Sequence, residues 1–115
     1  MGLFKRTSHA PAPEHAVILR YALSNDEHGT NEEREAIFAL EDRLANLIES
    51  QHLGAHDGNE FGGGQATIYC YGPDADRLFA GIESEVRAFP ARPAQAYLRF
   101  GDASDGNAQE RRIEL

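Results

Sequence analysis

Four residues with ionisable or metal-binding side chains lie within nine positions near the middle of the chain: His52, His56, Asp57 and Glu60. Imidazole and carboxylate groups bind zinc and act as general acids or bases, so this segment is a candidate ligand site. Its spacing argues against a metal, because His52 is expected to end a helix and His56 to lie in a strand. In the competing interpretation, His52 contacts the carbonyl groups at the helix end and Asp57 forms a turn. We therefore expect no metal and no cofactor.

The other motifs that could carry chemistry are incomplete. Gly62–Gly64 is followed by neither a Lys-Ser pair nor a helix, as a phosphate-binding loop requires. The amides at Gly72-Pro73-Asp74 are expected to be capped by the protein's own aspartates. Cys70 points inward in an alternating strand pattern, which is typical of a small core residue rather than a nucleophile. No nucleophile elbow or metalloprotease helix is present, so the sequence leans against an enzyme.

The first half of the chain predicts a strand followed by a helix. Residues 16–23 (AVILRYAL) are rich in β-formers and apolar on both sides, which favours a central strand. Thr30 and Glu33 have the spacing of a capping box, and apolar residues then recur at helical spacing. We expect this helix to span residues 31–51, with Gly54 as its left-handed stop.

The second half predicts a hairpin, a second helix and further strands. Residues 54–64 hold five glycines in eleven positions, which is typical of a bulged edge strand with a turn. Residues 66–71 and 95–101 alternate in polarity and are expected to be half-buried strands. Between them, the apolar stripe of residues 75–89 predicts a helix, in which Gly81 either marks close approach to the first helix or is merely tolerated. Residues 110–115 are expected to form a charged edge strand.

This order of elements, β-α-β-β-α-β with an optional fifth strand, predicts an α+β fold of the ferredoxin-like type. Residues 15–115 are expected to form the single domain and residues 1–14 a flexible leader. Two helices can cover only one face of the antiparallel sheet, so the other face stays open.

The open face is the candidate partner-binding surface. In this topology the first strand lies between the third and the fourth, so the outward side chains of these strands become neighbours. Turning Arg20 toward the helices instead would bury an unpaired charge, which favours the outward register. Tyr and Arg are enriched at binding hot spots, although tyrosines also cover ordinary solvated sheets. The candidate surface comprises Ile18, Arg20, Thr67, Tyr69, Tyr71, Tyr97 and Arg99.

Two stretches carry a resemblance to a known group of proteins. GAHDGNEFGGG precedes a predicted strand and YGPDADRLF precedes a predicted helix. Together they resemble small bacterial α+β proteins to which no activity is assigned. The resemblance implies a ferredoxin-like fold and gives no catalytic residue.

The net charge of the chain disfavours some classes of binding partner. The chain has 11 basic and 19 acidic residues and a formal net charge of −8, which repels a phosphate backbone. We therefore expect no nucleic acid as partner, and the absence of a long apolar run predicts a cytoplasmic protein without membrane contact. A single cysteine excludes an intrachain disulfide.

Two functions follow from these observations. The first is a non-enzymatic interaction or regulatory domain that uses the open sheet face to bind a second copy or a basic protein. The second is a small-molecule or anion-binding enzyme with its site in the glycine-rich segment 54–64.

Overall fold

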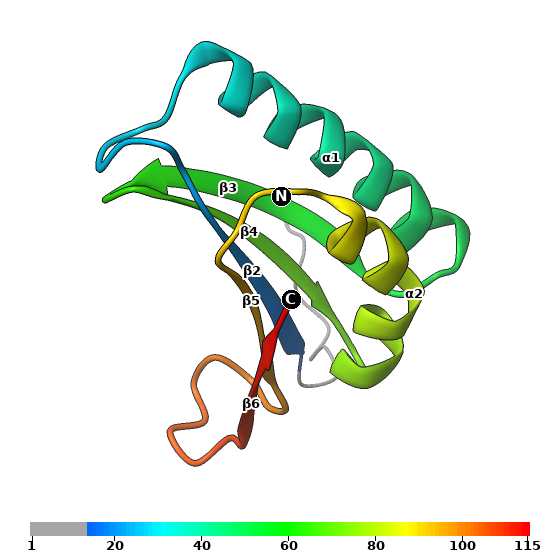
Figure 1. The fold of residues 1–115 in the computed structure, drawn as a ribbon. Coiled ribbons are helices and arrows are strands. Elements are labelled where there is room, and N and C mark those ends of the chain that lie inside the picture. Colours follow the sequence, from blue (N-terminus) through cyan, green and yellow to red (C-terminus); the bar gives the residue numbers. More distant parts are fainter. Residues whose placement is uncertain (1–13) are drawn as a thin grey trace, which may run out of the picture.

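The computed structural model describes residues 14–115 as one five-stranded antiparallel sheet with two helices on one face (Figure 1). The strands are β2 (His15–Ala22), β3 (Ala55–Gly62), β4 (Gln65–Gly72), β5 (Ala94–Arg99) and β6 (Glu110–Glu114), and the helices are α1 (Asn31–Ser50) and α2 (Ala75–Ala88). The sheet order is β3-β4-β2-β5-β6. The predicted α+β class is therefore confirmed, and the order is compatible with a ferredoxin-like arrangement.

The expected leader, residues 1–14, lies outside the described residues except for Glu14, which is exposed. Neither described helix is long and apolar enough to cross a membrane.

Helix α1 begins with the predicted capping box. The backbone N–H of Glu33 donates to the Thr30 hydroxyl (3.1 Å), and the Glu33 carboxylate accepts from the Thr30 N–H (2.9 Å). At the C-terminal end of α1, the prediction that Gly54 is the left-handed residue was wrong. That residue is His52, with φ 54°, because the N–H groups of His52 and Leu53 turn back to the last carbonyls of α1.

Two glycines lie where the connection after α1 meets the rest of the fold. A Cβ on Gly54, whose φ is 141°, would lie 1.9 Å from the carbonyl oxygen of Tyr71. A Cβ on Gly81 would lie 2.3 Å from Leu53 Cδ1. The close approach at Gly81 is therefore to the α1–β3 connection rather than to α1 itself.

The core lies between the helices and the inner face of the sheet. Val17, Leu19 and Tyr21 alternate along β2 and are fully buried there, as their spacing predicts. Burial raises the pKa of the Cys70 thiol to about 12, which fits a core residue rather than a nucleophile.

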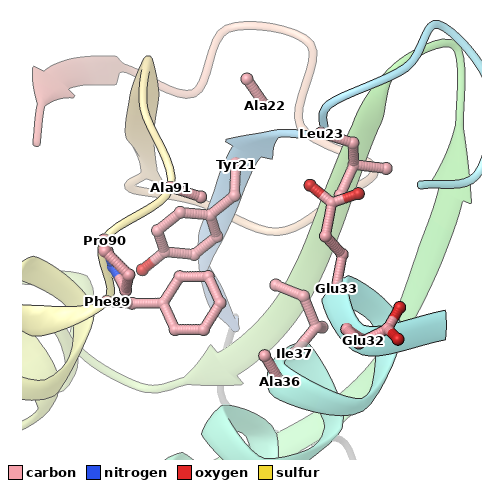
Figure 2. Close-up of a pocket in the computed structure, with 10 residues that line it drawn as sticks. All are labelled: Tyr21, Ala22, Leu23, Glu32, Glu33, Ala36, Ile37, Phe89, Pro90 and Ala91. Carbon is pink, nitrogen blue, oxygen red and sulfur yellow. The ribbon is translucent and has the colours of Figure 1, made fainter. Parts of the chain in front are cut away.

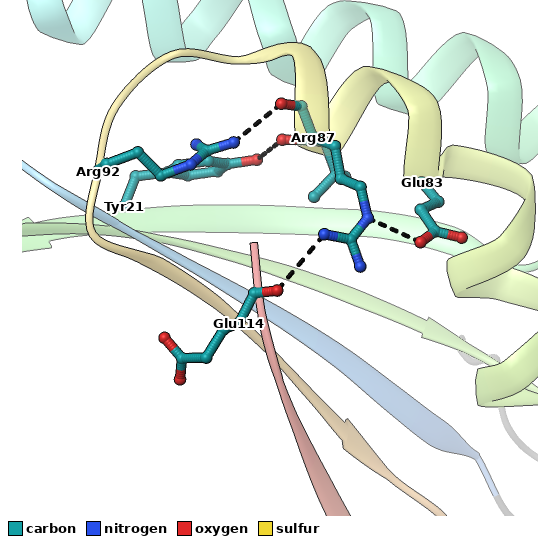
Figure 3. A network of polar contacts seen from close by, with 6 residues as sticks. Tyr21, Glu83, Arg87, Arg92 and Glu114 are labelled. Carbon is teal, nitrogen blue, oxygen red and sulfur yellow. Dashed lines mark hydrogen bonds and ion pairs between the residues drawn. The ribbon is translucent and has the colours of Figure 1, made fainter.

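A polar network links the core to the edge strand β6. The Tyr21 hydroxyl donates to the carbonyl of Val86 (2.7 Å), and the Arg92 guanidinium donates to the carbonyl of Arg87 (2.9 Å; Figure 3). Arg87 in turn contacts Glu83 (2.8 Å) and the backbone carbonyl of Glu114 (3.4 Å). These contacts hold the end of β6 against α2.

Both edges of the sheet are irregular or charged. Strand β3 carries the expected bulge, between His56 and Gly58. Strand β6 is only five residues long and contains two exposed arginines and two exposed glutamates besides Ile113. Edges of this kind resist pairing with further strands.

Candidate interaction surface on the open sheet face

All seven residues expected on the open face lie there, on three adjacent strands. Strand β2 is central, and its residues stand opposite partners on β4 and β5. The side chains next to them along each strand, such as Leu19 and Ile68, are buried under the helices. The cross-strand pairs are Ile18–Tyr69, Ile18–Tyr97, Arg20–Thr67, Ala16–Tyr71 and Ala16–Arg99. The sheet therefore gathers the three tyrosines and two arginines around Ile18.

The tyrosine and arginine side chains of this face are oriented by contacts with one another and with their neighbours. The Tyr69 hydroxyl donates to the Glu60 carboxylate (2.6 Å), and the Arg20 guanidinium lies 4.9 Å from the centre of the Tyr97 ring. The hydrogen bond to Glu60 raises the pKa of Tyr69, and burial raises the pKa of Tyr71. Both phenols are therefore neutral at physiological pH; the Tyr69 hydroxyl already donates to Glu60, and the Tyr71 hydroxyl can donate to a partner.

Arg99 has a structural role within this surface. Its guanidinium pairs with Glu110 (2.8 Å) and donates to the carbonyls of Asp102 (3.3 Å) and Asp105, while its buried Nε has no partner. Only 23% of its side chain is exposed. Arg99 thus fastens the connection between β5 and β6 and is less available to a partner than Arg20.

Arg20 is the cation of this face that the fold leaves free. Among residues 14–115 its guanidinium makes no side-chain hydrogen bond or ion pair and lies over the Tyr97 ring. It lies on the central strand next to Thr67, of which only 8% is exposed. A partner can therefore reach an uncommitted guanidinium at the middle of the sheet.

Strand β6 adds charged residues that our sequence-based surface omitted. Its alternation places Glu110, Arg112 and Glu114 on the open face beside Arg99, Tyr97 and Gln95. The alternating pattern of residues 110–114 was the signal for this, but the pairing partner of that strand was unknown. With these residues the face holds three arginines (Arg20, Arg99, Arg112) and three glutamates (Glu60, Glu110, Glu114).

The charge balance of the open face contrasts with the helical side. Helix α1 alone contains six acidic and two basic residues. The two helices together carry nine acidic and four basic residues, whereas the strands place three acidic and three basic side chains on the open face, with Asp102 at its border.

Two hollows flank Ile18 on this surface. One, of about 300 Å³, is lined by Arg20, Tyr97 and Glu110, and the other, of about 180 Å³, by Tyr71 and Asp102. Ile18 and Arg99 border both. The face is therefore uneven enough to accept side chains of a partner.

The structure distributes the four residues of the second candidate site over different environments. His52 is exposed after the end of α1, and Asp57 lies in the bulge of β3. His56 turns toward α1, whereas Glu60 lies on the open face with Tyr69. Within residues 14–115, no three His, Cys, Asp or Glu side chains are placed to hold a metal ion.

The contact that His56 makes involves a residue that the sequence reasoning missed. Its Nε2 lies 2.6 Å from the carboxylate of Glu41, whose other oxygen accepts from Asn59 Nδ2 (2.6 Å). Glu41 is only 5% exposed, in the stripe between Ile37 and Leu44. An acidic residue in the middle of that apolar stripe was the available signal. This cluster joins α1 to β3 and presents no nucleophile.

Comparisons with family models, curated proteins and solved structures find no match to this chain. Its function is therefore inferred from geometry alone.

Proposed function

We propose that this protein is a non-enzymatic interaction domain in which the open sheet face binds a second copy of the chain. The observation that carries the proposal is the group of Tyr69, Tyr97, Ile18 and Arg20 on a face that no helix of the described chain covers. Tyrosine and arginine combine large contact area with directional hydrogen bonding, which makes them frequent hot-spot residues.

Charge favours a second copy over a basic partner on this face. A basic protein would be steered toward negative potential, and α1 alone has six acidic and two basic residues. Two copies of a near-neutral face repel each other little, and its arginines and glutamates can pair between copies in a two-fold arrangement.

The extent of the face is compatible with a stable dimer. Five strands about 4.8 Å apart and about six residues long span roughly 24 by 20 Å, or about 500 Å² in projection. Because side chains protrude from the sheet, the solvent-accessible area of the face is larger than this projected area and approaches the roughly 800 Å² per partner of ordinary stable interfaces.

Sedimentation equilibrium with the double variant Tyr69→Ala/Arg20→Glu tests the proposal. Arg20 is preferred to Arg99 because Arg99 also fastens the β5–β6 connection. We expect twice the 12.7 kDa chain mass for the wild type and 12.7 kDa for the variant. Circular dichroism spectra should coincide, since neither side chain belongs to the core.

The matched control is Arg77→Glu, which makes the same charge change on the exposed side of α2. The control should remain a dimer. A wild type that is monomeric at about 100 µM, far above a micromolar dissociation constant, would overturn the proposal. If Arg77→Glu weakened the dimer as much as the double variant does, the interface would lie on the helical side and the proposal would be wrong.

A further inference from the structure

A pocket of about 340 Å³ lies at the end of the helical layer, on the opposite side of the sheet from the open face (Figure 2). It is bounded by the end of β2, the first two turns of α1 and the connection from α2 to β5. Its volume is near the lower limit of about 300 Å³ for small-molecule sites. The lining residues are Tyr21, Ala22, Leu23, Glu32, Glu33, Ala36, Ile37, Phe89, Pro90 and Ala91.

The pocket arises from the unequal lengths of the helices. Helix α1 has 20 residues and α2 has 14, so α1 is about 9 Å longer at about 1.5 Å per residue. In Figure 1, α1 extends past the end of α2 where the chain turns into β5. Beyond that end, Phe89 adopts an extended conformation and Pro90 cannot continue the helix.

The walls of the pocket are largely apolar and aromatic. The Phe89 and Tyr21 rings pack edge to face, with centroids 4.9 Å apart. Ile37 lies across from them on α1, and Leu23 and Ala91 are only partly buried (Figure 2). A small apolar or aromatic group would cover these side chains and displace water from them.

Several donors around the pocket are already in use. The backbone N–H groups of Ala22, Leu23 and Phe89 donate to carbonyls within the fold. The Tyr21 hydroxyl donates to Val86, and the nearby Arg92 guanidinium donates to three backbone carbonyls. A ligand with a carboxylate or phosphate would therefore find few groups to bind it.

Acceptors are present at the mouth of the pocket. Glu33 accepts from Thr30 and Ser24, and these hydrogen bonds hold its pKa below the usual range, so it is a fixed negative charge. Among residues 14–115, Glu32 makes no side-chain hydrogen bond or ion pair, and its carboxylate is exposed beside the pocket. Carboxylates beside an apolar cavity favour a ligand that combines a cationic group with an apolar group.

We propose that this pocket binds small primary amines that carry an aromatic or compact apolar group. The apolar group lies between Phe89 and Ile37, and the ammonium group lies at the mouth beside Glu32. This site is independent of the dimer surface, since the two lie on opposite faces of the sheet.

Isothermal titration calorimetry of the full chain with 2-phenylethylamine tests this inference, with 3-phenylpropionate as a probe of the same shape and opposite charge. We expect the amine to bind in the micromolar to millimolar range that its size allows, and the carboxylate to bind at least about tenfold more weakly. No measurable binding of the amine, or equal binding of both probes, would overturn the proposal.

Two substitutions locate the site. Ala36→Phe on the exposed surface of α1 fills the pocket without replacing a core side chain and should abolish amine binding. Glu32→Gln should raise the dissociation constant about two- to fivefold, as expected for a solvent-exposed ion pair. Glu35→Gln, three positions further along α1 and outside the pocket, is the control and should leave the dissociation constant of the amine unchanged. Retained affinity in Ala36→Phe would place binding elsewhere and overturn the proposal.

Discussion

The carboxylate of Glu41 on α1 lies 2.6 Å from Nε2 of His56 on β3, in an otherwise apolar layer. Asn59 completes the contacts of the carboxylate. Strand β3 thus packs against α1 through polar contacts as well as through the edge-to-face pair of Phe38 and Phe61. A buried carboxylate held in this way contributes to stability only while its partners remain in place.

Replacing Glu41 by alanine should therefore destabilise the fold. We expect the free energy of unfolding to fall by about 2–3 kcal/mol, because His56 and Asn59 lose their acceptor and a cavity remains. Urea denaturation measures the loss. Asp42→Ala, at the exposed neighbouring position, should change stability by less than about 0.5 kcal/mol. Equal stability of the two variants would contradict a structural role for Glu41.

Glu33 should make stability depend on acid pH. Its pKa is lowered from 4.5, first by the hydrogen bond from the Thr30 backbone and then by that from the Ser24 side chain. A carboxyl with a depressed folded-state pKa stabilises above its unfolded pKa, and this contribution is lost as pH falls through the folded value.

The variant Glu33→Gln isolates this effect. Thermal unfolding should show the variant less stable than the wild type at neutral pH, and the difference should shrink as the pH falls below 4.5 and through the lowered pKa of the folded state. Glu35→Gln, outside the capping box, should follow the wild type throughout. A difference that persists undiminished in acid would show that charge on Glu33 is not its cause.

The Cys70 thiol should be unreactive in the folded protein. Burial is the main reason that its pKa is raised to about 12, so almost no thiolate forms at about pH 8. Reaction with the disulfide reagent DTNB should be negligible in buffer and complete in urea. Rapid native labelling would mean that β4 opens readily or that Cys70 is accessible.

Gly54 and Gly62 form a matched pair for testing backbone crowding. Gly54→Ala should lower the free energy of unfolding by about 2–4 kcal/mol, since its Cβ would meet the Tyr71 carbonyl and its φ is 141°. A Cβ on Gly62 meets nothing within 4 Å, so Gly62→Ala should change stability by less than about 1 kcal/mol. Chemical denaturation of both variants checks this. Similar midpoints would contradict the close approach at Gly54.

Side-chain direction in the sheet was predictable from sequence because one face is buried. A one-residue shift of β2 would have placed Arg20 under the helices and Leu19 in water, so only one register avoids an unpaired buried charge. The alternation of β4 and β5 then fixed the outward tyrosines. The composition of the central open face was therefore accessible without coordinates.

The contacts of β3 were not predictable in the same way. The bulge between His56 and Gly58 inserts an extra residue, so simple alternation does not assign the side chains before and after it to the two faces. His56 and Glu60 were grouped by proximity in sequence, yet they lie on opposite faces of the sheet. The pocket at the end of α2 was also not predicted from the sequence, because it depends on how two helices of different length align in space.

The irregular β3 and the short, charged β6 have a consequence for assembly size. Both edge strands disfavour pairing with a strand of another molecule, so the sheet is not expected to extend sideways into a larger assembly. A dimer formed through the open face buries that face on both molecules. Pairing of this kind saturates at two chains, so concentrated solutions should contain discrete particles rather than fibres.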